Sequence, residues 1–335
     1  MNILTTSHRS ALYLAATLFA VGLACTSPKK AGGNNTNEIP GISGMAPLTA
    51  NTYLMVQDTK AHKKGHRAGI LTILDDGSNS YESLDVDELD KGDDRASDLE
   101  ALHVIPGRPG HFLAAESGRR ANGPGRIFHL AFDKDSDELS VLASWPVATR
   151  IEKPMDWGLG KGDNYEGLVC IPLDGDRYQL VLGERGGSKS HPRGALSTGT
   201  LDLDAGTLTW ESAATDMTLN SPGKWIEPKG PRDIGDLWYD ERDQSIWTAA
   251  TEDPGDKGPF RSVLWQACTV GEIDQETGLR SLIALENPTA AYTVDGHKIE
   301  AISSAPAKIN HAYLSIGAED EDYGGTWRGL YPPVQ

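Results

Sequence analysis

The sequence is short of basic residues, and this shortage excludes one class of partner. It contains 31 Lys and Arg against 48 Asp and Glu, which gives a formal net charge of −17. Nucleic-acid binding needs a basic surface that neutralises phosphates, so we expect no nucleic-acid partner. The sequence also has no nucleophile elbow, zinc-protease motif or glycine-rich phosphate-binding loop. It has no apolar stripe of helical period and useful length, which argues against a helical fold.

Cysteine is scarce as well. Beyond Cys25, only Cys170 and Cys268 are present, each inside an apolar run. A disulfide between them is permitted in an exported protein. Two buried free thiols are the alternative, and the different strand positions of the two residues favour it.

The N-terminal segment is typical of an export signal. His8 and Arg9 precede an apolar run at residues 11–24, which is too short for an ordinary spanning helix. The run ends in VGLAC, so the segment resembles a bacterial lipoprotein signal, in which Cys25 is lipidated after cleavage. An ordinary secretory signal with a chance cysteine is the alternative.

These features predict three segments and a location. Residues 1–24 are predicted as a signal peptide, residues 25–40 as the lipidated cysteine with a flexible tether, and residues 41–335 as the folded domain. The lipid on Cys25 would attach the protein to a membrane. We expect the outer membrane or the cell surface, because Thr26 is not the aspartate that resembles an inner-membrane retention signal. Without lipidation the protein would be periplasmic.

The folded part contains an internal repeat. Each copy has an apolar strand, a turn rich in Gly, Pro, Asp or Asn, and a second apolar strand that ends in a carboxylate. The copies are GISGMAPLTANTYLMVQD (41–58), DLEALHVIPGRPGHFLAAE (98–116), NYEGLVCIPLDGDRYQLVLGE (164–184), DIGDLWYDERDQSIWTAATE (233–252) and KIEAISSAPAKINHAYLSIGAE (298–319).

The repeat continues into a third strand. The terminal carboxylates are Asp58, Glu116, Glu184, Glu252 and Glu319, and nine or ten residues later come Arg67, Arg126, Arg193, Arg261 and Arg328. A fourth apolar segment follows in most copies, and the carboxylates recur every 58 to 68 residues. This pattern predicts an all-β fold, a five-bladed β-propeller of four-stranded antiparallel blades. The last copy stops after its third strand, so we expect residues 36–39 to supply the fourth.

The topology brings the charged positions to one face. In an up-and-down blade, the start of strand one, the end of strand two and the start of strand three share an end. The outer carboxylates and arginines therefore meet, and we expect each pair to tie strand two to strand three within its blade. Alternatively, Arg185 or Arg193 binds an anionic substrate.

The starts of the first strands surround the axis. They carry Ser43, Glu100, Glu166 and Glu300, and no basic residue stands at equivalent positions, so we expect these glutamates to be unpaired. Like carboxylates held together either take up protons or bind a cation. Calcium suits an axial ring of Glu, Ser and carbonyl oxygens, so Ca²⁺ is predicted here. In the fourth blade either the Gly235 carbonyl or Asp236 takes the ligand position.

The blade starts also carry a family resemblance. The motifs DLEAL, NYEGL, DIGDL and KIEAI resemble those of the SdiA-regulated family of bacterial propellers over roughly residues 41–331. The chain is similar in outline to calcium-activated nucleotidases and to phytase-like esterase propellers. The first family implies a calcium-binding propeller without an established reaction, and the other two imply hydrolysis. The resemblance assigns Ser43, Glu100, Glu166 and Glu300 to the metal.

Two functions remain open from the sequence. The first is a calcium-binding propeller that acts as a binding or scaffold protein of the cell envelope. Its partner would be an anionic small molecule or an envelope component. The second is a calcium-dependent hydrolase of phosphoanhydrides, phosphoesters or esters, with its site on the axial face. For the second, the candidate bases are Asp58, Glu116 and Glu184, and the candidate charge-stabilising residues are Arg185 and Arg193.

Overall fold

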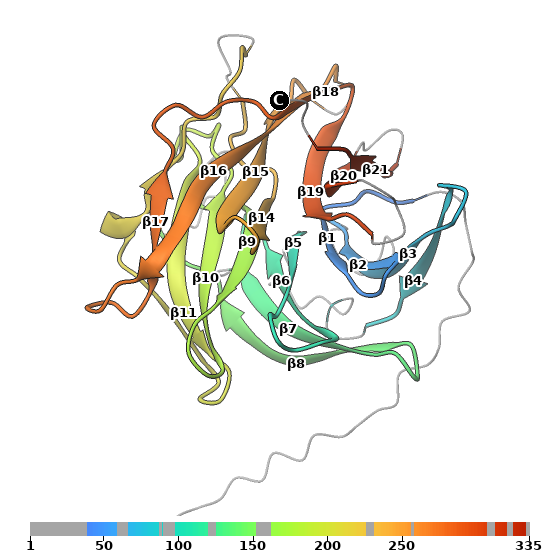
Figure 1. The fold of residues 1–335 in the computed structure, drawn as a ribbon, viewed down its shortest axis with the longest axis horizontal. Helices are drawn as coiled ribbons and strands as arrows, with labels where there is room; N and C mark the ends of the chain where they lie inside the picture. Colours follow the sequence, from blue (N-terminus) through green and yellow to red (C-terminus); the bar gives the residue numbers. More distant parts are fainter. Residues whose placement is uncertain are drawn as a thin grey trace, which may run out of the picture.

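Five antiparallel β-sheets surround one axis, as Figure 1 shows. The structure is a computed structural model, and it describes residues 39–58, 66–86, 89, 98–119, 125–151, 162–225, 231–255, 258–306, 312–319 and 324–332. The sheets follow one another in chain order, and each pairs neighbouring strands antiparallel. The predicted all-β, five-bladed propeller is confirmed.

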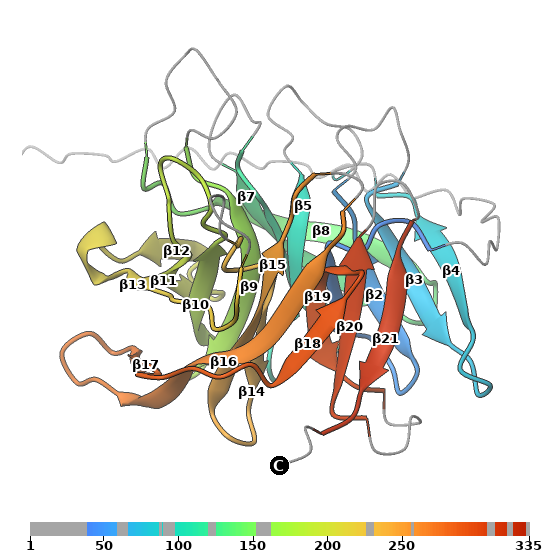
Figure 2. The same ribbon diagram turned by 90° about the horizontal axis from the view of Figure 1, so that it is seen from above.

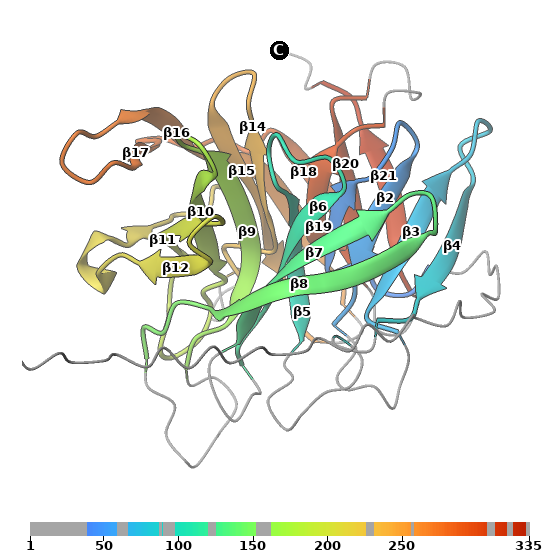
Figure 3. The same ribbon diagram turned by 90° about the horizontal axis from the view of Figure 1, so that it is seen from below.

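Each of the first two blades has four strands. The first blade contains β1 (Gly44–Pro47), β2 (Thr52–Val56), β3 (Ala68–Ile73) and β4 (Asn79–Leu84). The second contains β5 (Leu99–Val104), β6 (His111–Glu116), β7 (Arg126–Asp133) and β8 (Glu138–Pro146). Figure 2 and Figure 3 show from the side that the strands of a blade run between the two ends of the ring.

The third and fourth blades each add a short strand to the basic four. The third contains β9 (Tyr165–Pro172), β10 (Arg177–Glu184), β11 (Ala195–Asp202) and β12 (Thr207–Trp210), with β13 (Met217–Thr218) paired to β11 after the 3₁₀ turn η1 (Ala213–Thr215). The fourth contains β14 (Leu237–Asp240), β15 (Ser245–Glu252), β16 (Arg261–Ile273) and β17 (Arg280–Ala284), with β18 (Tyr292–Asp295) paired to β16.

The last blade closes the ring. It contains β19 (Lys298–Ser304), β20 (Leu314–Glu319) and β21 (Thr326–Leu330). Ile39 forms an antiparallel bridge with Gly325, whose N–H donates to the Ile39 carbonyl at 2.7 Å. Ile39 is buried, so it belongs to the propeller rather than to the predicted tether. This bridge lies where the fourth strand was expected, and residues 36–38 of that strand lie outside the described residues.

Burial changes from the axis outward. The inner strands β5 and β9 are buried at nearly every residue, which suits strands covered on both faces. The outer strand β8 alternates between exposed and covered residues, as a half-buried strand does. Figure 1 shows β1, β5, β9, β14 and β19 around the centre, with β4, β8 and β17 at the rim. No helix in the described ranges has the length and apolar character needed to cross a membrane.

The hydrophobic core lies between successive blades. Leu54 of β2 and Phe112 of β6 belong to the cluster between the first two blades. Met45 of β1 and Trp327 of β21 belong to the cluster that joins the last blade to the first. Each blade therefore buries its faces against two neighbours, so the ring is stable only as a whole. The thiols of Cys170 and Cys268 are free and buried, which confirms that these two residues do not form a disulfide.

Small residues let the inner strands approach closely. A Cβ on Gly44 of β1 would lie 2.7 Å from the Leu102 backbone nitrogen of β5. A Cβ on Gly167 of β9 would lie 2.8 Å from the Leu237 backbone nitrogen of β14. Both glycines directly follow a predicted metal ligand. The glycine after Ser43 and the glycine after Glu166 are therefore packing requirements of the narrow axis.

Gly44→Ala tests this packing requirement. The added methyl meets backbone that cannot rotate away, so we expect a loss of about 1–3 kcal/mol in the free energy of unfolding. Urea unfolding measures it. Gly271→Ala in β16 is the matched control, because its methyl meets the movable Ser281 hydroxyl. Equal unfolding midpoints for the two variants would contradict close packing at the axis.

Candidate functional site

The five predicted ligand positions occupy one end of the axis, called here the acidic mouth. It is formed by Ser43, Glu100, Glu166, Asp236 and Glu300, which stand at or directly before the starts of β1, β5, β9, β14 and β19. All five residues are buried. The inner strands pack side by side around the ring, so these positions from different blades lie near one another.

The electrostatics of Glu100 show that carboxylates gather here. Burial raises the pKa of Glu100 well above its ordinary range, and the charge of Glu166 raises it further. Asp98, Glu300 and Asp58 add to the shift in the same direction. Glu100 therefore feels acidic groups from four blades, as the repeat predicted.

Two of the axial glutamates have basic partners, so the expectation of unpaired glutamates is wrong. The Arg185 Nη1 group donates to Glu166 Oε1 at 2.9 Å, and Lys298 forms an ion pair with Glu300. Arg185 directly follows β10, and Lys298 opens β19 two positions before its partner. Sequence reasoning considered basic residues only at the repeat position that carries the glutamate. Arg185 and Lys298 stand at other positions, so both were missed.

The oxygen atoms of Ser43, Glu166 and Asp236 differ in how many hydrogen bonds they already make. The Ser43 hydroxyl is buried and has no hydrogen-bond partner within the described ranges. Glu166 accepts the hydrogen bonds from Arg185 and from Asn164 through the same oxygen, Oε1. In contrast, Asp236 Oδ1 accepts from the Leu237 N–H at 2.8 Å, and Oδ2 accepts from the Ile302 N–H at 2.7 Å. Oδ1 of Asp236 therefore binds within the fourth blade, and Oδ2 links the fourth blade to the fifth.

A second group of ionisable side chains lies on the third blade, and it is called here the Asp163 cluster. Asp163, Glu184 and His191 place one ligand atom each within 4.8 Å of one another. The axial carboxylates form no such set in the described part of the chain. The axial carboxylates repel one another, and Glu166 and Glu300 are each drawn to a basic side chain, Arg185 and Lys298. This accounts for the wider separation of the axial carboxylates.

Backbone groups hold the Asp163 cluster in place. The Asp163 Oδ2 atom accepts from the N–H groups of Arg150 and Ile151, at 2.9 and 3.2 Å. Its Oδ1 atom lies 2.9 Å from His191 Nε2. Glu184 ends β10 and accepts from the Asn164 N–H, and its Oε2 atom lies 3.9 Å from the same His191 nitrogen.

The cluster shifts two pKa values upward. Burial raises the pKa of Glu184 to about 7, and the charge of His191 only partly offsets this effect. Burial alone would lower the pKa of His191, but the hydrogen bond to Asp163 and the charge of Glu184 outweigh it and raise the pKa. Because a carboxylate oxygen accepts, His191 Nε2 donates to Asp163 Oδ1, and this arrangement suits acid–base chemistry better than metal ligation through that nitrogen.

Sequence reasoning identified Glu184 but missed Asp163 and His191. Asp163 lies three positions before Glu166, as Asp233 does before Asp236, and this spacing was an available signal. His191 lies in the connection between β10 and β11, whose path no repeat position specifies.

The outer ring of carboxylates and arginines is only partly formed. Within the described residues, Glu116 and Arg126 make the expected pair inside one blade, with Nε and Nη2 donating at 3.0 and 2.9 Å. Arg67 of the first blade lies 3.6 Å from the same carboxylate, and both side chains are fully buried. Glu116 therefore ties two blades together, a structural role that sets it apart from the other predicted bases.

Two other arginines of the repeat differ from expectation. Arg261 pairs with Asp295 at 2.7 Å, and Arg193 is exposed and forms no ion pair with any described residue. Asp58 acts on the pKa of Glu100, so it lies near the acidic mouth. The prediction of five self-neutralising pairs is therefore wrong, because Arg261 pairs with Asp295 of its own blade and Arg193 stays exposed. The fifth predicted pair falls on Glu319, whose side chain lies outside the described residues.

Comparison with known proteins supports the fold and leaves the family open. No protein-family model and no curated protein matches the sequence. Among solved structures, a thermostable family-43 glycoside hydrolase is similar with a TM-score of 0.50 and 13% identity, covering 88% of this chain and 89% of that chain. A glycosyl hydrolase from Bacteroides ovatus has a TM-score of 0.46 and 11% identity, covering 90% and 87%. At these identities the likeness shows the fold alone, and the SdiA-regulated resemblance stays a prediction.

Glu184→Gln tests the cluster through the pH dependence of stability. A raised pKa means that the folded state keeps a proton that the unfolded chain releases. The contribution of this proton to the free energy of unfolding is therefore fully present below pH 4.5, the ordinary pKa of a glutamate. It is lost as the pH rises through about 7. In the variant we expect this loss to be smaller by roughly 2–3 kcal/mol. Urea unfolding at a series of pH values measures it.

The control for this experiment is Glu138→Gln, at the exposed start of β8. Its stability profile is expected to follow that of the unmodified protein. If the Glu184→Gln profile also overlaid that of the unmodified protein, Glu184 would not hold a proton in the folded state.

Proposed function

We propose that the acidic mouth binds a divalent cation and that the chain is a calcium-binding propeller of the cell envelope. The observation that supports this most strongly is the buried Glu100 carboxyl, whose pKa is raised by burial and by the acidic groups of neighbouring blades. Such a group is stabilised either by a proton or by a cation. A cation that several blades contact would also strengthen the ring.

The donor chemistry fits a hard cation. The proposed ligands are the Ser43 hydroxyl, the Glu100 carboxylate, Glu166 Oε2 and the Glu300 carboxylate, all of them oxygen donors. Calcium accepts about six to eight oxygen ligands in irregular arrangements. Asp236 is left out of this set, because both of its oxygens accept hydrogen bonds from backbone N–H groups.

The envelope location rests on the N-terminal sequence. Residues 1–24 have the character of an export signal, and Cys25 stands where a lipid would be attached. In this proposal the lipid anchors the propeller at the outer membrane or cell surface, and the acidic face is presented to an envelope component. Both the signal and Cys25 lie outside the described residues.

Two substitutions with opposite effects test the cation site. Glu100→Gln removes a ligand charge, so we expect calcium affinity to fall by about tenfold or more. Lys298→Gln removes the cation that competes for Glu300, so we expect calcium affinity to rise. Isothermal titration calorimetry measures both, and the melting temperature should rise with calcium in the unmodified protein.

The matched control is Glu241→Gln, an exposed acid that follows β14 at the opposite end of the axis. It should bind calcium as the unmodified protein does. If neither binding heat nor a calcium-dependent rise in melting temperature were observed for the unmodified protein, the proposed site would be refuted.

A calcium-dependent hydrolase is the second candidate, and the Asp163 cluster favours it. A carboxyl with a pKa of about 7 is poised to give or take a proton near neutral pH. Glu184 would be the general acid or base, and Asp163 would orient His191 beside it. Arg185, whose buried Nε has no hydrogen-bond partner in the described ranges, would stabilise developing negative charge. A bound cation would supply polarisation of the scissile group.

A hydrolase assay separates the two candidates. The substrates are p-nitrophenyl phosphate, p-nitrophenyl acetate, ATP and p-nitrophenyl glycosides, the last because similar folds include glycoside hydrolases. If the chain is a hydrolase, Glu184→Gln should reduce kcat by about 100-fold or more at neutral pH. Glu138→Gln should keep full activity. Failure to turn over any of these substrates, with calcium or with chelator, would reject the hydrolase and leave the cation proposal standing.

A further inference from the structure

A cavity of about 410 Å³ opens at the other end of the axis. It lies where the inner strands finish, at Pro47 of β1, Val104 of β5, Asp240 of β14 and Ser304 of β19. Four blades therefore contribute to it, and it is called here the distal pocket. Its size falls within the range of about 300–1,000 Å³ that is typical of small-molecule sites.

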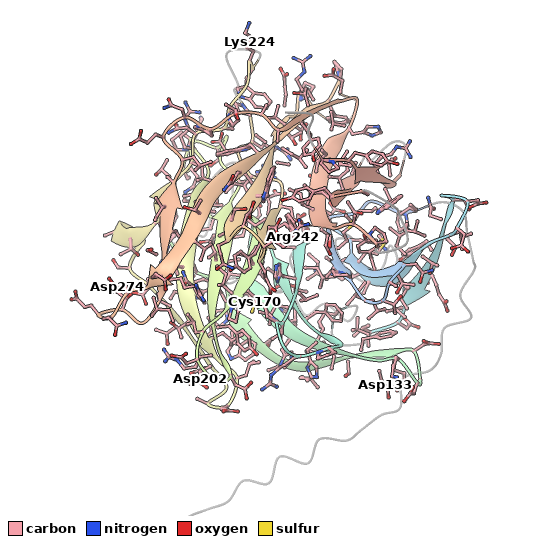
Figure 4. All side chains as sticks on the ribbon, in the orientation of Figure 1. Asp133, Cys170, Asp202, Lys224, Arg242 and Asp274 are labelled. Atoms are coloured by element: carbon pink, nitrogen blue, oxygen red, sulfur yellow. The ribbon has the colours of Figure 1, made fainter. Side chains whose placement is uncertain are left out.

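One wall of the distal pocket is an ordered group of aromatic and charged side chains. The rings of Trp238 and Tyr313 pack edge to face, with centroids 6.0 Å apart. The Arg242 guanidinium lies over the Tyr313 ring, 4.4 Å from its centroid. Figure 4 shows Arg242 close to the centre of the ring, whereas Asp133, Asp202 and Asp274 lie at its rim.

The charge in this wall is already neutralised. Asp240 Oδ1 accepts from Arg242 Nε at 2.9 Å, and Oδ2 accepts from Arg242 Nη2 and from the Tyr313 hydroxyl, each at 2.6 Å. The Arg242–Asp240 pair is thus fixed in orientation and close to neutral. Arg242 still presents its Nη1 donors, because none of the described residues accepts from them.

Three buried side chains around the pocket have unused hydrogen-bonding atoms. Trp238, Ser303 and His103 all line it and are each at least nine-tenths buried. Among the described residues, the Trp238 Nε1–H donor and the Ser303 hydroxyl have no hydrogen-bond partner. His103 Nδ1 lies 2.8 Å from the Val104 carbonyl oxygen and donates to it, which leaves Nε2 as an acceptor. Burial lowers the pKa of His103 to about 4, so the ring is neutral at physiological pH.

The donors and acceptors of the distal pocket indicate which class of ligand it can bind. The pocket offers donors from Trp238 and Arg242, an acceptor from His103, and the Ser303 hydroxyl, which can do both. A carboxylate or phosphate would use only the donors and would be repelled by the net charge of −17. A hydroxyl-bearing ring satisfies donors and acceptors together, and its C–H faces can contact the aromatic wall and the apolar side chains of Leu102 and Ile302.

We propose that the distal pocket is a binding site for a neutral saccharide of one or two sugar units. The proposal does not depend on the cation site, because the two sites occupy opposite ends of the axis and share no residue. A sugar site here would give the propeller a second ligand beyond any bound at the acidic mouth.

The test is a binding assay with named sugars. Saturation-transfer NMR and calorimetry are carried out with D-glucose, D-galactose, D-xylose, cellobiose and xylobiose, and with D-glucuronate as the anionic comparison. We expect at least one neutral sugar to bind and to bind more tightly than D-glucuronate. Absence of binding by all five neutral sugars, or stronger binding of D-glucuronate, would overturn the proposal.

Matched variants locate the binding. Trp238→Phe keeps a ring and removes the Nε1–H donor, so the affinity for the bound sugar should fall by about threefold to tenfold. Trp247→Phe is the control, because Trp247 is the cross-strand partner of Trp238 and its Nε1 donates to Ser245 outside the pocket. Ser303→Ala should weaken binding by a similar factor, and Glu138→Gln, at the exposed start of β8, should leave it unchanged.

Melting curves establish that each variant is folded before its affinity is interpreted. If Trp238→Phe and Ser303→Ala both bound the sugar as tightly as Trp247→Phe does, the sugar would bind elsewhere and the assignment to the distal pocket would be wrong.

Discussion

The close packing of the inner strands around the axis is the constraint on which the rest of the structure depends. Gly44 and Gly167 leave no room for a Cβ against the next blade, so neighbouring blades are held at backbone contact. The residue before each of these glycines is then held at the same end of the axis as its equivalents from other blades. Carboxylates that would repel one another in solution are thereby buried together, and the stability of the ring supports that arrangement.

The molecule relieves this concentration of negative charge in several ways. Arg185 and Lys298 pair with two of the axial glutamates, and Asp236 receives backbone hydrogen bonds from its own blade and the next. Burial, and after it the charges of the neighbouring carboxylates, raises the pKa of Glu100 well above its ordinary range. On the third blade, burial raises the pKa of Glu184 to about 7, and the neighbouring carboxylates raise the pKa of His191. Burial of acidic side chains therefore accounts for both the proposed affinity for a cation and the acid–base character of the cluster.

The sequence was sufficient to predict the repeat, the number of blades and the end of the axis at which Ser43 and the three glutamates lie. These follow from strand topology, because the start of every inner strand must face the same way. The pairing of side chains was not predictable in this way. Lys298 reaches Glu300 through a bulged strand start, Arg67 crosses to the next blade, and His191 depends on a loop with no counterpart in the repeat. The distal pocket, too, is built from side chains at strand ends whose spacing carries no repeated signal.

The most direct test of the account is an NMR titration of the Glu100 side-chain carboxyl with and without calcium. The account predicts a pKa well above the ordinary 4.5 in the absence of calcium, because burial and neighbouring carboxylates disfavour the charged form. It also predicts that calcium shifts the titration to lower pH, since a bound cation favours that form. An ordinary pKa that calcium does not change would show that the inner strands do not bring these carboxylates together, and it would contradict the account.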